Sequence, residues 1–132
     1  MRRYIIASHG KFSYGIKNSL EMIIGERANI DYICAYVNGN NESVDNKIKE
    51  MLKKVQDDDE VIVFTDILGG SITNLFLKYA KKKNIHIIAG TNLPLVLEVV
   101  TSEDLPIDVV IKNSINSAKE SIVYLNKLIE KM

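Results

Sequence analysis

Residues 61–66 read Val-Ile-Val-Phe-Thr-Asp, and residues 67–71 continue with Ile-Leu-Gly-Gly-Ser. The apolar run is short, rich in β-branched residues and without polar alternation, which predicts a parallel strand buried on both faces. A carboxylate, Asp66, stands where that strand ends, and a glycine-rich turn leads into a predicted helix. In an open α/β sheet, ligands bind at this edge of the strands. The stretch therefore predicts both a fold class and the place of a functional site.

The same strand-then-helix pattern repeats along the chain. Strands are predicted at residues 3–7, 30–37, 61–65 and 85–89, and helical apolar periods at 13–25, 44–55, 71–79 and 92–100. Residues 38–41, Asn-Gly-Asn-Asn, predict a loop, and Ser13 and Ser71 are expected to cap their helices. We therefore expect a single α/β domain over residues 1–132. It would be a doubly wound, mostly parallel sheet of order 2-1-3-4 with helices on both faces.

The C-terminal segment is compatible with two structures. A helical apolar period runs through residues 111–129. In the helix predicted at 13–25, Ile23 and Ile24 are likewise expected on the apolar face. Residues 122–125, Ile-Val-Tyr-Leu, are also typical of an edge strand. Because proteins usually cover exposed sheet edges, this segment could pair antiparallel with the sheet of a second copy in a homodimer.

Composition excludes several classes of function. The 132 residues include 17 Lys or Arg and 17 Asp or Glu, and the resulting zero net charge argues against a dominant nucleic-acid or anionic-membrane surface. The N-terminal residues do not have the pattern of a signal peptide, and no apolar run approaches the roughly 20 residues of a membrane-spanning helix, so we expect a cytoplasmic protein. The single cysteine, Cys34, is expected to be buried and reduced. The acidic run at residues 57–60 is interpreted as a solvated turn.

A histidine and a carboxylate are expected to meet at the switch point of the sheet. His9 follows the first strand as Asp66 follows the third, and these strands are neighbours in the order 2-1-3-4. A carboxylate that accepts one imidazole N–H fixes the tautomer and leaves the other nitrogen nucleophilic. Gly69 and Gly70 allow backbone N–H groups near an anion, and the helix from Ser71 adds its positive end. We expect His9 and Asp66 to be catalytic, Gly69, Gly70 and Ser71 to bind phosphate, and no metal or cofactor to be needed.

Three motifs together carry a family resemblance. They are Ser8-His9-Gly10, residues 65–71 with Asn74, and residues 89–94, Ala-Gly-Thr-Asn-Leu-Pro. In order and spacing they resemble the IIA component of the mannose family of the bacterial sugar phosphotransferase system, over essentially the whole chain. Leu68 and Ile72 stand where some members carry tryptophan and proline, which alters the surface that faces partners and leaves the chemistry intact.

The resemblance implies a phosphotransferase that works through a phosphohistidine. His9 would accept a phosphoryl group on Nε2 from the phosphocarrier protein HPr and pass it to a IIB protein. IIB would then phosphorylate sugar that enters through a membrane IIC/IID complex. No IIB domain follows in this chain, so IIB is expected to be a separate protein. Asp66 matches the aspartate that binds Nδ1, and residues 69–71 match the segment that receives the phosphate. Members of the family form dimers through a C-terminal strand.

Three other functions stay open from the residues alone. A response-regulator-like receiver would carry its phosphate on Asp66, but Ser8 and His9 stand where a receiver needs an acidic metal-binding pair. A Ser-His-Asp hydrolase could use Ser71 or Ser8, but no Gly-x-Ser-x-Gly motif is present. A flavodoxin-type binding module would need a phosphate or flavin loop after the first strand. Acid-labile, base-stable phosphate would distinguish phosphohistidine from phosphoaspartate.

Overall fold

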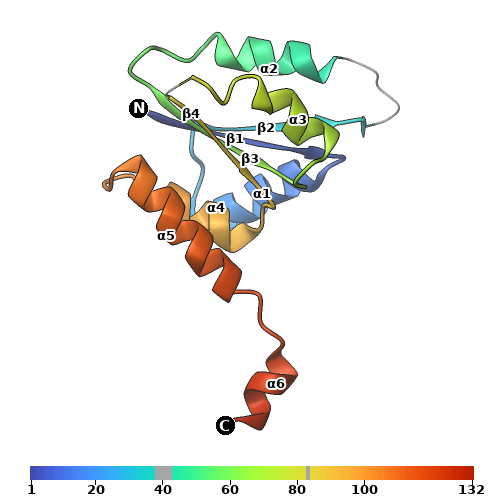
Figure 1. Ribbon diagram of the computed structural model, residues 1–132, viewed down its shortest axis with the longest axis vertical. Coiled ribbons are helices and arrows are strands. Elements are labelled where there is room, and N and C mark those ends of the chain that lie inside the picture. Colours follow the sequence, from blue (N-terminus) through green and yellow to red (C-terminus); the bar gives the residue numbers. More distant parts are fainter. Residues whose placement is uncertain (38–42, 83) are drawn as a thin grey trace. The chain divides into compact units, whose positions relative to one another are not determined.

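Four strands form one parallel sheet in the computed structural model, which describes residues 1–37, 43–82 and 84–132 (Figure 1). The strands are β1 (Arg2–His9), β2 (Ile30–Ala35), β3 (Glu60–Thr65) and β4 (Ile85–Ala89), in the order β2-β1-β3-β4. The predicted order 2-1-3-4 is therefore confirmed. The loop predicted at residues 38–41 lies outside the described residues.

The two central strands are buried along almost their whole length. All five residues 61–65 of β3 have 0% exposed surface, which explains why their sequence shows no polar alternation. Ala7 of β1 stands opposite Thr65 of β3 in the register, so both strands end at the same edge of the sheet. His9, the last residue of β1, and Asp66, the residue after β3, are therefore brought to that edge together.

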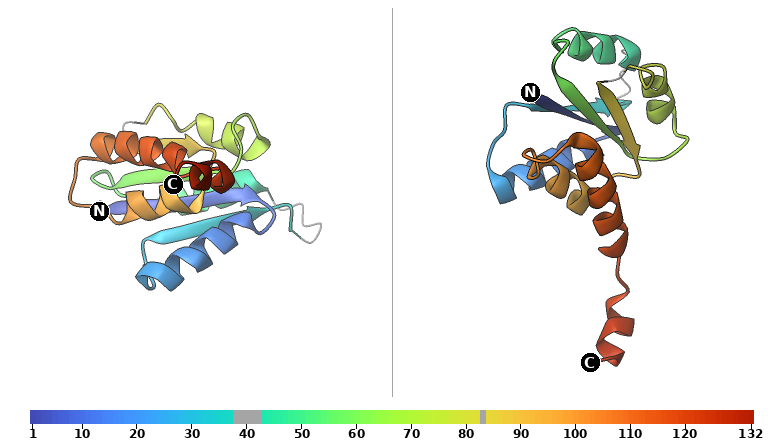
Figure 2. Two further views of the ribbon diagram at one scale, coloured as in Figure 1. Left: turned by 90° about the horizontal axis from the view of Figure 1, so that it is seen from below. Right: turned by 60° about the vertical axis from the view of Figure 1, so that its left-hand side comes forward.

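Helices cover both faces of this sheet, as expected. Helix α1 (Phe12–Ile24) lies on one face, and α2 (Val44–Leu52) and α3 (Ser71–Leu77) lie on the other (Figures 1 and 2). Ile48 of α2 and Phe76 of α3 are fully buried in the core on their side. Leu20 of α1 is also fully buried, whereas Ile23, which was expected on the same apolar face, is 57% exposed.

The starts of α1 and α3 differ from the expected serine caps. The residues at the cap positions are Lys11 and Gly70, and neither makes a side-chain capping bond. Ser13 lies inside α1, where its backbone N–H donates to Ser8 Oγ at 2.7 Å. The Ser13 hydroxyl donates to the Ile33 carbonyl at 2.7 Å and does not cap the helix.

Two further expectations, for Asp59 and Cys34, are corrected by the burial of these side chains. Asp59, in the acidic run expected to be solvated, is only 5% exposed. Its carboxylate accepts the Gln56 backbone N–H at 3.0 Å and Arg3 Nε at 2.9 Å. These two bonds, of which the one from Gln56 has the larger effect, lower the pKa of Asp59 to about 2. Cys34 is half-buried rather than buried, because β2 is an edge strand.

The chain forms two compact units, Met1–Leu93 and Pro94–Met132. The second contains most of α4 (Leu93–Val100), then α5 (Ile107–Glu120) and α6 (Leu125–Glu130). Ser117 of α5 donates to Glu98 of α4 at 3.4 Å. The helical period expected through residue 129 is interrupted at residues 121–124, which have no regular structure, and the strand considered for residues 122–125 is absent from the described sheet. No helix in the described part of the chain is long and apolar enough to cross a membrane.

Candidate active site

His9 and Asp66 are hydrogen-bonded to each other at the end of β1 and β3. Asp66 Oδ2 lies 2.8 Å from His9 Nδ1 and also accepts the His9 backbone N–H at 2.8 Å. The second carboxylate oxygen, Oδ1, accepts the Ile67 backbone N–H at 3.0 Å. One oxygen therefore holds both the backbone and the ring of His9, which leaves the imidazole little freedom to turn.

The surroundings of Asp66 keep its carboxylate charged. Its side chain is 11% exposed, and this burial raises its pKa. The hydrogen bonds from the His9 backbone and ring outweigh burial, so the pKa of Asp66 lies below its usual value. An ionised carboxylate can only accept hydrogen bonds, so Nδ1 of the His9 ring carries a proton. When the ring is neutral, Nε2 therefore presents its lone pair.

The turn that faces Nε2 depends on two glycines. Gly69 has φ +79°, a left-handed conformation that suits glycine. A Cβ added at Gly70 would crowd the Ile67 carbonyl oxygen at 3.3 Å and would contact His9 Cε1 at 3.4 Å. Ser71, the first residue of α3, places its Oγ 3.2 Å from His9 Nε2. Asp66, Gly70 and Ser71 thus lie against the His9 ring, and Gly69 belongs to the same turn.

Threonines hold the end of β3 in place behind the site. The Thr91 hydroxyl donates to the Thr65 carbonyl at 2.6 Å, and the Thr91 backbone N–H donates to the same oxygen at 3.1 Å. The Thr73 hydroxyl lies 2.7 Å from Thr65 Oγ1 and 2.6 Å from the Ile67 carbonyl. The motif at residues 89–94 therefore supports the residue before Asp66, a role that sequence reasoning did not assign to it.

Sequence reasoning also missed Tyr36. The prediction extended the second strand to residue 37, but β2 ends at Ala35 and Tyr36 turns with φ +61°. Its hydroxyl lies 3.2 Å from Ser71 Oγ, and its ring centroid lies 5.6 Å from that of His9 at an interplanar angle of 41°. Nothing in the apolar pattern indicates this contact, since residue 36 reads as a continuation of the strand.

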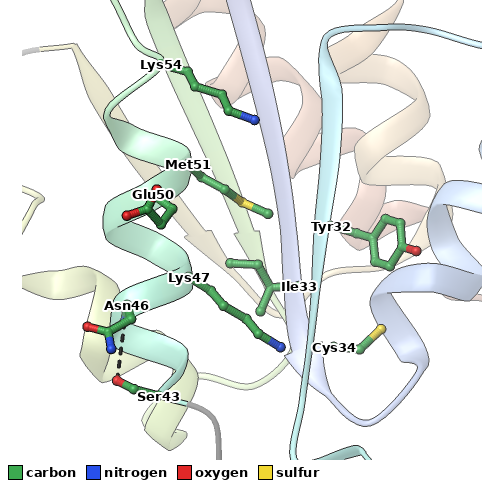
Figure 3. Close-up of a pocket in the computed structure, with 9 residues that line it drawn as sticks. All are labelled: Tyr32, Ile33, Cys34, Ser43, Asn46, Lys47, Glu50, Met51 and Lys54. Carbon is green, nitrogen blue, oxygen red and sulfur yellow. Dashed lines mark hydrogen bonds between the residues drawn. The ribbon is translucent and has the colours of Figure 1, made fainter.

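A separate hollow lies between α2 and the edge strand β2 (Figure 3). Its volume is about 640 Å³, and neither His9 nor Asp66 lines it. Met51 and Ile33 face this hollow, whereas Tyr32 and Cys34 point to the other side of β2. Within residues 1–37, 43–82 and 84–132, no group of three or more His, Cys, Asp or Glu side chains is arranged to hold a metal ion.

The family model and the relatives that match this chain are all described as components of the PTS. The family model described as "PTS system fructose IIA component" matches residues 3–117. The fructose-specific EIIA component of Bacillus subtilis (strain 168) is 28% identical over 130 residues, covering 97% of this chain and 89% of that protein. The mannose-specific EIIAB component of Escherichia coli (strain K12) is 28% identical over 101 residues, 76% of this chain and 31% of that longer protein.

A solved structure is similar over nearly the whole chain. It is a Klebsiella pneumoniae protein assigned to the phosphoenolpyruvate-dependent sugar phosphotransferase system as a permease. The two share 37% identity with a TM-score of 0.90, over 97% of this chain and 93% of the other.

Proposed function

The chain belongs to the fructose and mannose IIA family of the sugar phosphotransferase system, and on that premise we propose that His9 is its phosphoryl carrier. His9 accepts a phosphoryl group from HPr on Nε2 and passes it to a separate IIB protein. The observation that carries this assignment is the bond from Nδ1 to Asp66 Oδ2 at 2.8 Å. It fixes the proton on Nδ1 and leaves Nε2 as the nucleophile.

The transfer needs no reagent beyond the two proteins. The Nε2 lone pair attacks the phosphorus of phospho-HPr, a new N–P bond forms, and the bond from phosphorus to HPr breaks with its electrons returning to HPr. The His9 ring gains positive charge in this step, and the Asp66 carboxylate beside Nδ1 stabilises that charge. The second step reverses the first, with IIB as the acceptor.

The turn at Gly69, Gly70 and Ser71 is where we place the phosphoryl oxygens. Ser71 Oγ is already 3.2 Å from Nε2, so its hydroxyl can reach an oxygen bound to the phosphorus there. The absence of a side chain at Gly70 keeps the space beside Cε1 open. Phosphoryl transfer depends mainly on positioning and on stabilising charge, so our proposal includes no metal or cofactor.

The decisive experiment is to phosphorylate the protein and locate the phosphate. The chain is incubated with HPr, the kinase that phosphorylates HPr, and phosphoenolpyruvate, and is then digested for mass spectrometry. We expect one phosphate per chain, on His9, labile in acid and stable in base. A base-labile phosphate on Asp66 would instead support the receiver function and contradict ours.

A second candidate function is favoured by one observation. Ser71 Oγ, His9 and Asp66 form a continuous chain of contacts of 3.2 Å and 2.8 Å, the arrangement used by Ser-His-Asp hydrolases. Ser71→Ala separates the two functions. A phosphoryl carrier keeps His9 as its acceptor in this variant, whereas a hydrolase loses its nucleophile and all activity towards an ester substrate.

The wider assignment follows from the family. We propose a single cytoplasmic IIA domain over residues 1–132 that works with HPr and IIB, upstream of a membrane IIC/IID complex. The E. coli EIIAB relative is much longer than this chain, and we propose nothing from the part of it that the match does not cover.

We also propose a homodimer joined through the C-terminal segment. Every residue from 119 to 132 is exposed, including the apolar side chains Ile122 (77%), Tyr124 (67%) and Ile129 (65%). Apolar side chains gathered in one exposed segment mark an interaction surface. In the dimer, residues 121–125 would pair with the edge of the partner's sheet. Sedimentation at micromolar concentration tests the dimer, and truncation after Lys119 tests the segment. A monomeric full-length protein, or a truncated one that stays dimeric, would contradict the respective part.

A further inference from the structure

We propose that Tyr36 is a positioning residue for phosphoryl transfer, which acts through Ser71 on the reacting nitrogen of His9. The inference rests on the proposed function of His9. It assigns to Tyr36 a hydrogen bond that directs the Ser71 hydroxyl proton, first to Nε2 and then to the incoming phosphoryl group.

The backbone places Tyr36 at the site at some cost. Among the non-glycine residues that the structure describes, Tyr36 is the one with positive φ, at +61°. Bulky residues rarely adopt this conformation, and strained residues of this kind cluster at functional sites. The bond from the Gly10 N–H to the Ala35 carbonyl, 2.8 Å, ties the residue before Tyr36 to the residue after His9. The turn therefore brings the tyrosine ring against the imidazole.

The direction of the hydrogen bonds follows from counting protons. In the neutral ring, which is the nucleophilic form, Asp66 fixes the proton on Nδ1, so Nε2 can only accept. Ser71 has one hydroxyl proton, which must point to Nε2 if their 3.2 Å contact is a hydrogen bond. Ser71 Oγ can then only accept from its other neighbour, the Tyr36 hydroxyl at 3.2 Å. The chain thus runs from Tyr36 to Ser71 to His9.

Phosphorylation changes the acceptor at the end of this chain. Once the Nε2 lone pair forms the N–P bond, the Ser71 proton loses its acceptor and can donate to a phosphoryl oxygen instead. Because Tyr36 still donates to Ser71 Oγ, the serine proton stays directed at the reacting group and is polarised as a donor. The Tyr36 ring, 5.6 Å from the imidazole centroid, also flanks the ring as it becomes cationic.

The test is a double-mutant cycle on single-turnover transfer from phospho-HPr. Tyr36→Phe removes the hydroxyl and keeps the ring, and Ser71→Ala removes the group through which Tyr36 acts. We expect Tyr36→Phe to slow transfer about two- to tenfold, the worth of one hydrogen bond, with an unchanged thermal unfolding midpoint. In the Ser71→Ala background, the same substitution should have no further effect. We expect the ¹⁵N chemical shift of His9 Nε2 to move in both Tyr36→Phe and Ser71→Ala, and in the same direction.

Tyr14→Phe is the matched control. Tyr14 is 50% exposed and packs edge-on against Tyr32 rather than against His9, so its variant should transfer at the wild-type rate. Wild-type transfer and an unmoved Nε2 shift in Tyr36→Phe would overturn the inference while leaving phospho-His9 intact. An equal loss with and without the Ser71 hydroxyl would show that Tyr36 does not act through Ser71, and would also overturn it. A wild-type protein that takes no phosphate on His9 would overturn the proposed function and this inference together.

Discussion

The two ends of the β1–β3 pair each hold a carboxylate against a basic side chain, but the two basic side chains differ in chemistry. At one end Asp59 binds Arg3 at 2.9 Å, and at the other Asp66 binds His9 at 2.8 Å. Both carboxylates are largely buried, and both have a lowered pKa. The partners differ, because a guanidinium has only donors and stays charged, whereas an imidazole keeps a second nitrogen with a lone pair. The topology therefore builds two carboxylate pairs, and only the one with a histidine offers a nucleophilic nitrogen for the proposed phosphoryl transfer.

The two ends should differ most clearly in His9→Ala. Nε2 is the proposed attachment point, so we expect phosphorylation by phospho-HPr to be abolished, while the fold persists because the His9 side chain is 41% exposed. Radiolabelled phosphoenolpyruvate and circular dichroism measure the two outcomes. His86→Ala is the control, since the other histidine of the chain is the second residue of β4, near the start of that strand, and should not affect phosphorylation. Stoichiometric labelling of folded His9→Ala would disprove the carrier role.

Asp66→Asn should have the next largest effect. The amide keeps the size of the side chain but removes the charge that supports a cationic ring and fixes its tautomer. Loss of such an orienting carboxylate slows comparable histidine chemistry by up to about 10⁴-fold, and we expect a loss of at least about 10²-fold. Single-turnover kinetics measure it, with His9 still the acceptor.

The matched variant at the opposite end is Asp59→Asn. It removes a charge of the same kind from the same pair of strands, so the transfer rate of the folded protein should stay at the wild-type value. Equal losses of rate in both variants would mean that the two ends are not chemically distinct.

Asp59 should reveal itself in acid stability instead. Its pKa is about 2 in the folded protein, below its ordinary value of 3.8, because of bonds from Gln56 and Arg3. The charged form is thus favoured by folding, so this contribution is complete above about pH 5 and is lost as the pH falls towards 2. We expect urea unfolding at pH 7 to show Asp59→Asn as less stable than the wild type. The difference should narrow at pH 2.5. A difference that does not change with pH would point to packing rather than charge.

The buried strands and the meeting of His9 with Asp66 could be predicted, because they depend on local apolar pattern and on the order of the strands. Unalternated apolar runs identified the buried strands, and the strand order then placed His9 beside Asp66. Asp59 was misjudged because its partner Arg3 is 56 positions away, and consecutive acidic residues look solvated when read locally.

Other misses have the same physical origin. Tyr36 was missed because an apolar residue after a strand gives no sign that its φ is positive. Ser13 was taken for a cap because the competing hydroxyl, that of Ser8, becomes its neighbour only when β1 and α1 come together. The C-terminal segment satisfied both a helical and a strand pattern, and local preference cannot decide between them.

The smallest effect is expected on the surface around the reactive end, which is the end of β1 and β3 that holds His9 and Asp66. Leu68 is 83% exposed beside Gly69, and the neighbouring Ile67 is 57% exposed. An apolar side chain at the rim of the site is suited to contact HPr or IIB, so Leu68→Ser should raise the KM for phospho-HPr by about tenfold at most, as expected from partial burial of one leucine. The kcat should not change, because Leu68 makes no described contact with His9 or Asp66. Leu77→Ser, an exposed leucine at the other end of α3, is the control and should leave the KM unaltered. Equal effects of the two variants would mean that exposed leucines act through stability or solubility, and that the apolar rim of the reactive end has no part in docking.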